Sequence, residues 1–245
     1  MRRVSTVAGS GPILLVLLAV IFAAAPVADA GLTVYDRVTG VGSPVFLEVE
    51  TRRFGFPEGG TRVRLFLDGR ALGEILTGAD GRGYLKYTPS ATGELRLAGR
   101  WQDAEDTGRL LVLGPKEKVV VVEVDSALRS NPLDLAVRAG SAAALETLTR
   151  GYRLIYLGSL LALHQHAESG SPPTGWPQTL ILRRTGGQAT FKYLAAHGVH
   201  PFAVVGSAGL LSASKPHVKR RFSFEQTADG ETIKDWPAVL EALGR

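Results

Sequence analysis

Apolar residues recur at every second position in several short runs between residues 31 and 114, which is the period of a half-buried β-strand. Val45, Leu47 and Val49 form one such run, and residues 63–67 and 95–97 repeat the pattern. The turn signals between the runs are Glu58-Gly59-Gly60, Asp68-Gly69 and Asp80-Gly81. This short, even spacing predicts an all-β sandwich of about six or seven strands, and we expect Trp101 in the core or at an interface.

The pattern changes at Gly114 to Lys118, a segment that we expect to separate two domains, 31–114 and 118–245. Val119 to Val122 is a continuous β-branched run, typical of a parallel strand that is buried on both faces. Helical and strand patterns then alternate. We expect helices over about 133–150, 160–168, 187–197 and 235–243, and strands over 154–157, 180–182, 202–205 and 222–224. This alternation predicts an α/β domain with a mainly parallel sheet.

The N-terminus has the three parts of a signal peptide. Arg2 and Arg3 precede an apolar run from Ile13 to Ala25, and Ala28-Asp29-Ala30 is a small-x-small cleavage site. The run is short for a membrane-spanning helix, which needs about 20 apolar residues. We therefore expect residues 1–30 to be removed and the protein to be periplasmic or secreted, with no transmembrane span after cleavage. The alternative is a protein anchored to the membrane by an uncleaved N-terminus.

Composition narrows the possible partners. Apolar residues make up 45% of the 245 residues, enough for a substantial core. The 28 basic and 23 acidic residues give a net charge of +5 without the concentrated basic stripe of a nucleic-acid-binding protein, so we expect no nucleic acid partner. The chain has no cysteine, which excludes disulfides and thiolate metal sites.

Candidate chemistry lies where the predicted parallel strands end, because open α/β sheets bind ligands beyond the carboxyl ends of their strands. Glu123-Val124-Asp125 follows the first strand. Two carboxylates at this spacing lie on the same side of an extended chain and can face one phosphoryl group. Gly206 and Ser207 follow a later strand, where backbone N–H groups at a helix start can bind an anion.

The segment Glu123 to Ala127 resembles the first motif of the haloacid dehalogenase (HAD) phosphatases, in which two acids flank one residue. The resemblance covers 118–245 and implies a HAD-like (Rossmannoid) domain with Glu123 at the nucleophile position and Asp125 at the general-acid position. Ile155 to Ser159 resembles the second motif, which implies that Ser159, after Gly158, hydrogen-bonds phosphate. The stretch from there to Leu182 is similar to lipin-type phosphatidate phosphatases, and Leu72 to Pro89 resembles bacterial immunoglobulin-like domains.

The third HAD motif supplies a lysine, and Lys192 is the best match, with Lys215 or Arg183 as alternatives. The other motifs depart from the family pattern. The nucleophile is Glu in place of Asp, and Ser126-Ala127 replaces Gly-Thr. Gly206 to Gly209 replaces the acids that hold Mg²⁺ in the family, and no Asp or Glu occurs between Glu168 and Glu225. We therefore expect no metal site and no cofactor, and Mg²⁺ only if the chain is an active enzyme.

Two further clusters need an interpretation. A basic group near the C-terminus either contacts phosphates or forms a solvated face, and we favour the second: Lys215, His217, Lys219, Arg220 and Arg221. His164 and His166 fall in a predicted helix, where positions two apart diverge, so a zinc site is not expected.

Three functions fit the sequence. The first is a non-catalytic HAD-like module that binds a phosphorylated small molecule, an anionic lipid headgroup or another protein in the cell envelope. The proposed ligand-binding residues are Ser126, Gly158, Gly206, Ser207 and Lys215. The second is a slow Mg²⁺-dependent phosphohydrolase that uses Glu123, Asp125, Ser159 and Lys192. The third is a purely structural envelope protein.

Overall fold

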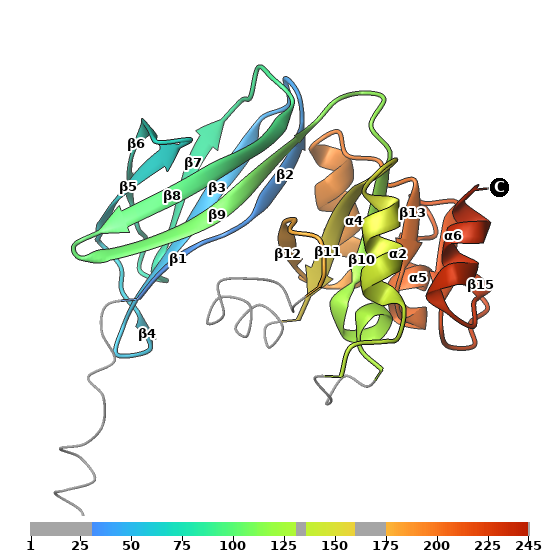
Figure 1. Cartoon of the computed structure of the whole chain (residues 1–245). Helices are drawn as coiled ribbons and strands as arrows, with labels where there is room; N and C mark the ends of the chain where they lie inside the picture. The colour runs from blue at the N-terminus through green and yellow to red at the C-terminus, as the bar shows by residue number, and fades with distance from the viewer. Residues whose placement is uncertain (1–30, 131–135, 160–174, 245) are drawn as a thin grey trace, which may run out of the picture.

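Nine strands between Gly31 and Leu113 form two facing sheets in the computed structural model, which describes residues 31–130, 136–159 and 175–244 (Figure 1). One sheet contains β1 (Gly31–Val34), β3 (Val45–Arg53), β4 (Phe56–Pro57) and β7 (Arg82–Tyr87). The other has the order β2-β9-β8-β5-β6, with β2 (Arg37–Gly40), β5 (Arg62–Leu67), β6 (Arg70–Leu76), β8 (Gly93–Trp101) and β9 (Ala104–Leu113). The predicted sandwich is therefore confirmed.

The core of the sandwich comes from the alternating positions that the sequence identified. Val45, Leu47 and Val49 of β3 are fully buried against residues of the facing sheet. Trp101 is also buried, as expected. The turn between β5 and β6 is the predicted Asp68-Gly69, and both residues have positive φ angles (47° and 78°), as this kind of hairpin turn requires.

The second half of the chain contains a sheet of six parallel strands in the order β12-β11-β10-β13-β14-β15. Their bounds are β10 Val119–Glu123, β11 Arg153–Gly158, β12 Ile181–Arg183, β13 Ala203–Val205, β14 Arg220–Ser223 and β15 Glu231–Thr232. The first strand, β10, lies inside the sheet, and all its residues are buried. This is the environment that the continuous valine run predicted.

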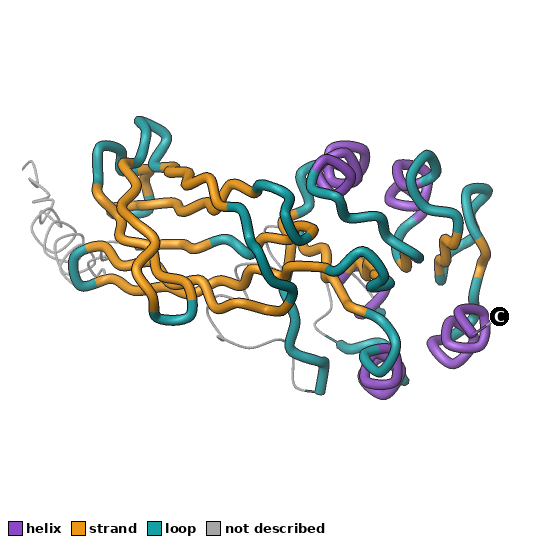
Figure 2. Tube along the Cα trace, turned by 90° about the horizontal axis from the view of Figure 1, so that it is seen from above, coloured by secondary structure: helices purple, strands orange, loops and turns teal. Residues whose placement is uncertain are grey.

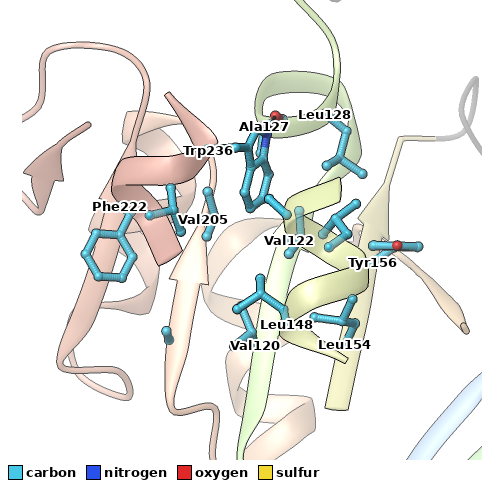
Figure 3. Close-up of a cluster of buried hydrophobic side chains, with 14 of the residues drawn as sticks. Val120, Val122, Ala127, Leu128, Leu148, Leu154, Tyr156, Val205, Phe222 and Trp236 are labelled. Atoms are coloured by element: carbon cyan, nitrogen blue, oxygen red, sulfur yellow. Dashed lines mark hydrogen bonds between the residues drawn. The ribbon is translucent and has the colours of Figure 1, made fainter. Parts of the chain in front are cut away.

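Helices cover both faces of this sheet (Figure 2). One face packs against α2 (Ser141–Leu148) and α6 (Trp236–Gly244), with Trp236 next to Ala127 in the buried cluster (Figure 3). The indole N–H of Trp236 donates to the carbonyl of Ala127 at 3.1 Å. The other face packs against α4 (Gly187–Ala196) and α5 (Ala208–Ser214).

Some elements differ from the sequence-based expectations. The helix expected over 133–150 starts at Ser141, directly after Gly140, which has a left-handed φ of 76°. Residues 124–128 form a π-helical turn, η1, that was not predicted. The expected helix at 160–168, with His164 and His166, and the signal peptide at 1–30 lie outside the described residues. In the described ranges, no helix is long and apolar enough to span a membrane.

The sandwich and the parallel sheet share a packed interface. Val38 and Leu111 of the sandwich belong to the same buried cluster as Phe191 and Leu194 of α4. The Asp36 carboxylate accepts hydrogen bonds from the backbone N–H of Arg109 and of Ile181, both at 2.7 Å. The Gly40 N–H donates to the His197 carbonyl at 2.8 Å. These contacts join strand β2 to β12 and to the end of α4.

Candidate functional site

The carboxyl ends of β10, β11 and β13 meet at one edge of the parallel sheet. Glu123 of β10 pairs in register with Leu157 of β11, and Val122 pairs with Val205 of β13. Alternate residues of β10 face opposite sides of the sheet. Val119 and Val121 face α4 and α5, so the side chain of Glu123 is directed to that same side.

The Glu123 carboxylate is held by three donors. Its Oε2 accepts hydrogen bonds from the Ser126 hydroxyl at 2.6 Å and from the Ser207 backbone N–H at 2.7 Å. Its Oε1 forms an ion pair and hydrogen bond with the Arg184 guanidinium. The Glu123 side chain is 1% exposed, whereas that of Arg184 is 37% exposed. A buried carboxylate needs such a cation and hydrogen-bond donors to remain charged.

The backbone at Gly206 fits closely around this carboxylate. A Cβ atom at Gly206 would lie 2.9 Å from Glu123 Oε2 and 2.8 Å from Leu210 Cδ2. Both distances are shorter than real Cβ contacts, so only glycine fits here without a shift of the surrounding atoms. Gly206 therefore allows the Ser207 N–H to reach Glu123, while the Ser207 hydroxyl caps α5 by accepting from Leu210 N at 3.4 Å.

Asp125 makes separate contacts. Its carboxylate accepts from the backbone N–H of Ser159 at 3.0 Å and from the Ser159 hydroxyl at 3.3 Å. The expectation that Glu123 and Asp125 follow one another on an extended strand is wrong, because β10 ends at Glu123 and the chain turns into η1. The two acids consequently bind different partners, and Asp125 connects the ends of β10 and β11.

We call the residues gathered here the Glu123 cluster: Glu123, Asp125, Ser126, Ser159, Arg184, Gly206 and Ser207. Gly158, the last residue of β11, is buried beside it. Six of these positions, and Gly158, were candidates from the sequence. Arg184 was missed, although its position gave a usable signal: it directly follows β12, so it lies at the same edge as the other strand ends.

The two lysines proposed from the sequence do not join the Glu123 cluster. Lys192 is exposed on α4, and its side chain makes no ion pair or hydrogen bond with any residue that the structure describes. Lys215, at the end of α5, pairs with Asp229 at 2.9 Å. The cation beside Glu123 is therefore Arg184, and Arg183, the other alternative, lines a different cavity.

The donor set of the Glu123 cluster does not suit Mg²⁺. A hard cation needs several free oxygen ligands, whereas Glu123 is already paired with a guanidinium and two further donors. The positions after β13 are Gly206 and Ser207, which supply no carboxylate. Within 31–130, 136–159 and 175–244, no three His, Asp or Glu side chains are grouped as a metal site.

Two arginines of the basic cluster near the C-terminus are engaged within the fold. Arg220 donates to the carbonyls of Ala242 and Leu243 at 3.2 and 3.1 Å. Arg221 donates to the carbonyls of Asp229 and Val218. Lys215, His217 and Lys219 are exposed, as a solvated face predicts, whereas Arg220 and Arg221 are only partly exposed and bind carbonyls within the fold.

No protein-family model and no curated protein matches the chain. Solved structures with partial similarity include the CARDB domain of a Pyrococcus furiosus protein, with 19% identity over 35% of this chain and 93% of that one, at a TM-score of 0.26. Fibronectin(III)-like modules of Clostridium thermocellum CbhA match at 16% identity over 34% and 98% of the two chains, with a TM-score of 0.25.

An FMN-binding β-glucuronidase from Faecalibacterium prausnitzii matches at 15% identity and a TM-score of 0.28. The match covers 35% of this chain but only 12% of the glucuronidase, so this chain corresponds to a small part of that protein's length. These TM-scores are too low to support an assignment. The N-terminal half is a sandwich because it has two facing sheets with a shared core.

Proposed function

We propose that this chain is a non-catalytic HAD-like module joined to an immunoglobulin-like sandwich, and that it acts outside the cytoplasm by binding rather than by phosphoryl transfer. The HAD likeness is supported by the order β12-β11-β10-β13-β14, in which the first strand of the domain is central. It is also supported by Glu123 and Asp125 after that strand and Ser159 after the next. The export of the protein rests on the tripartite N-terminus.

The observation that carries the proposal is the state of the Glu123 carboxylate. A carboxylate nucleophile must present an oxygen lone pair in line with the phosphorus. Glu123 is 1% exposed, and both of its oxygens are bound by donors from its own chain. Attack on a substrate would require the loss of the Arg184 pair and the opening of the packed segment at Gly206.

Charge balance supports the same conclusion. A phosphoryl group brings nearly two negative charges to a site that already contains Glu123 and Asp125. In the HAD family a metal ion and a lysine offset this repulsion, whereas here only Arg184 is in the Glu123 cluster and it is already paired. The loss of one well-placed charge stabiliser commonly costs about 100-fold in rate, and among the described residues the Glu123 cluster has neither a group of metal ligands nor a free cation.

We propose that the bound partner is a phosphorylated small molecule, an anionic lipid headgroup or another protein of the envelope. The Glu123 carboxylate is already bound by Arg184, Ser126 and Ser207. We therefore expect such a ligand to bind elsewhere than at the carboxyl edge of the sheet. Each of the three partners is compatible with the net charge of +5.

The test is hydrolysis of p-nitrophenyl phosphate and of phosphatidate by the pure protein with Mg²⁺. We expect no turnover above the buffer rate, and no difference between the wild-type protein and Glu123→Gln. Robust turnover that disappears in Glu123→Gln but persists in Glu225→Gln, an exposed acid outside the Glu123 cluster, would establish the slow phosphohydrolase instead.

A further inference from the structure

A cavity of about 320 Å³ lies between the sandwich and the α/β domain, and none of its lining residues belongs to the Glu123 cluster. We propose that this cavity, the interdomain pocket, binds a small organic anion that carries an aromatic ring. The inference deepens the proposed function, because it rests on the protein acting by binding and names where and what it binds. A volume of this size is typical of small-molecule sites.

The walls of the interdomain pocket are largely aromatic. Tyr35, Phe46 and Tyr84 come from the sandwich, and Tyr193 comes from α4. Phe46 is 54% exposed and Tyr84 is 51% exposed, which is unusual for large apolar side chains on two neighbouring strands. β3 and β7 pair directly, so these two rings project from adjacent strands. A flat ring inserted here would remove their exposed faces from water.

The charges of the interdomain pocket leave one cation available. Three arginines line it, but only one acid does, Glu48. Arg37 and Arg82 both pair with Glu48, and Arg37 also donates to the carbonyls of Phe46 and Asp36. Arg82 also pairs with Glu50 at 3.7 Å, so both arginines are engaged by acids of the sandwich.

Arg183 is the third arginine, and it comes from the end of β12. Its side chain makes no ion pair or hydrogen bond with any residue of the described ranges, and the residue is only partly exposed. Burial and the neighbouring Glu50 raise the pKa of Tyr35 to about 12, while Arg82 and, to a smaller extent, Arg183 act to lower it. An arginine beside aromatic walls binds a carboxylate or phosphate and stacks on a ring at the same time.

The interdomain pocket is preformed by contacts between the two domains. The Tyr193 hydroxyl donates to the Val38 carbonyl at 3.4 Å, and the Tyr193 ring lies 4.2 Å from that of His197. The Gly40–His197 and Asp36–Ile181 backbone contacts hold the same interface. A ligand would therefore enter an existing cavity, and its binding would not require the domains to rearrange.

Calorimetric titration of the mature chain tests this inference with three probes: 2-naphthoate, neutral 2-naphthalenemethanol and inorganic phosphate. We expect 2-naphthoate to bind at least about tenfold more tightly than either comparator, because only it offers both a ring and a charge. Arg183→Gln should weaken 2-naphthoate at least about tenfold. The matched control Arg70→Gln, an exposed arginine on β6 outside the interdomain pocket, should leave its affinity unchanged.

Tyr84→Ala provides a second variant, because an exposed side chain can be shortened without loss of the fold. It should also weaken 2-naphthoate. Equal binding of the neutral alcohol or of phosphate, undiminished binding in Arg183→Gln, or no binding of any probe would each overturn the inference. Hydrolysis of phenyl phosphate, measured in the same samples, separates the non-catalytic proposal from the proposal of an aromatic-anion site. Turnover would contradict the first proposal and would not affect the second.

Discussion

The Glu123 cluster and the interdomain pocket are both built around charged side chains, but they use these charges differently. In the Glu123 cluster the buried Glu123 carboxylate binds Arg184, Ser126 and Ser207. These contacts join the ends of strands β10, β12 and β13. In the interdomain pocket two arginines are paired with Glu48, and Arg183 lacks a partner among the described residues. Paired charges thus hold the Glu123 cluster together as a structural connection, whereas a cation without a partner beside open volume marks a place where a ligand can bind.

The largest effect should follow from Glu123→Gln. The substitution leaves the Arg184 guanidinium without its counter-charge and places an amide N–H₂ where an acceptor is needed. Loss of one partner of a buried pair commonly costs about 3–5 kcal/mol. Because Arg184 is 37% exposed, we expect a smaller decrease of about 2–4 kcal/mol in the free energy of unfolding. Urea denaturation measures this, with Glu225→Gln as the control that should change it by less than about 0.5 kcal/mol.

Asp36 should make the stability of the interface depend on pH. Burial raises the pKa of Asp36 from 3.8 to about 6, although its hydrogen bonds from the Ile181 and Arg109 N–H groups act in the opposite direction. The folded state therefore binds the proton more tightly than the unfolded state between about pH 6 and pH 4. Its free energy of unfolding should rise as the pH falls through this window, by up to about 3 kcal/mol from this group.

The variant Asp36→Asn should lose this contribution. It should also lower the stability at pH 7 by about 1–3 kcal/mol, because the amide of asparagine can accept from only one of the two N–H donors and its N–H₂ faces the other. Urea titrations at several pH values measure both quantities. An unchanged pH slope between 4 and 6 would show that Asp36 is not the titrating group.

Gly206→Ala should destabilise the protein by about 1–3 kcal/mol, because the new methyl group would overlap Glu123 Oε2 and Leu210 Cδ2. Gly209→Ala is the matched control, since a Cβ at Gly209 in α5 has no atom within 4 Å. Alanine is the better helix former, so this control should be neutral or slightly stabilising. If both variants unfold at the same urea concentration, the close fit around Glu123 is not as described.

The smallest effect on stability should come from Arg183→Gln. No hydrogen bond or ion pair to the described residues is lost, so we expect the free energy of unfolding to change by less than about 0.5 kcal/mol. Thermal and urea unfolding measure it. A loss as large as that of Glu123→Gln would mean that Arg183 holds the interface together and is not available to a ligand.

The sequence predicted the features that depend on a local pattern of apolar residues, such as strands and the residues at their ends. The valine run at 119–122 identified the buried first strand, and the strand ends located Glu123, Ser159 and Ser207 at one edge. It did not predict the turn η1 after Glu123, because nothing in that short segment distinguishes a π-helical turn from an extended one. As a result, the relation between Glu123 and Asp125 was misjudged.

The interdomain pocket was beyond the reach of sequence patterns. Its walls bring Tyr35 and Phe46 next to Arg183 and Tyr193, residues separated by well over a hundred positions along the chain. Their proximity depends on the packing of β2 against β12 and α4, and no periodicity encodes a contact between two domains. Only the charge pairing in three dimensions reveals that Arg37 and Arg82 are satisfied while Arg183 is not.

The most direct test of the central claim, that the Glu123 carboxylate is a structural group and not a nucleophile, is the steady-state rate of phosphomonoester hydrolysis with Mg²⁺ by the wild-type protein and by Glu123→Asp. Aspartate keeps the carboxylate but shortens the side chain by one methylene, so it should weaken the contacts with Arg184 and Ser207. We expect no turnover by either protein and a lower free energy of unfolding for the variant. Wild-type turnover well above the buffer rate, abolished by loss of the carboxylate in Glu123→Gln, would contradict it.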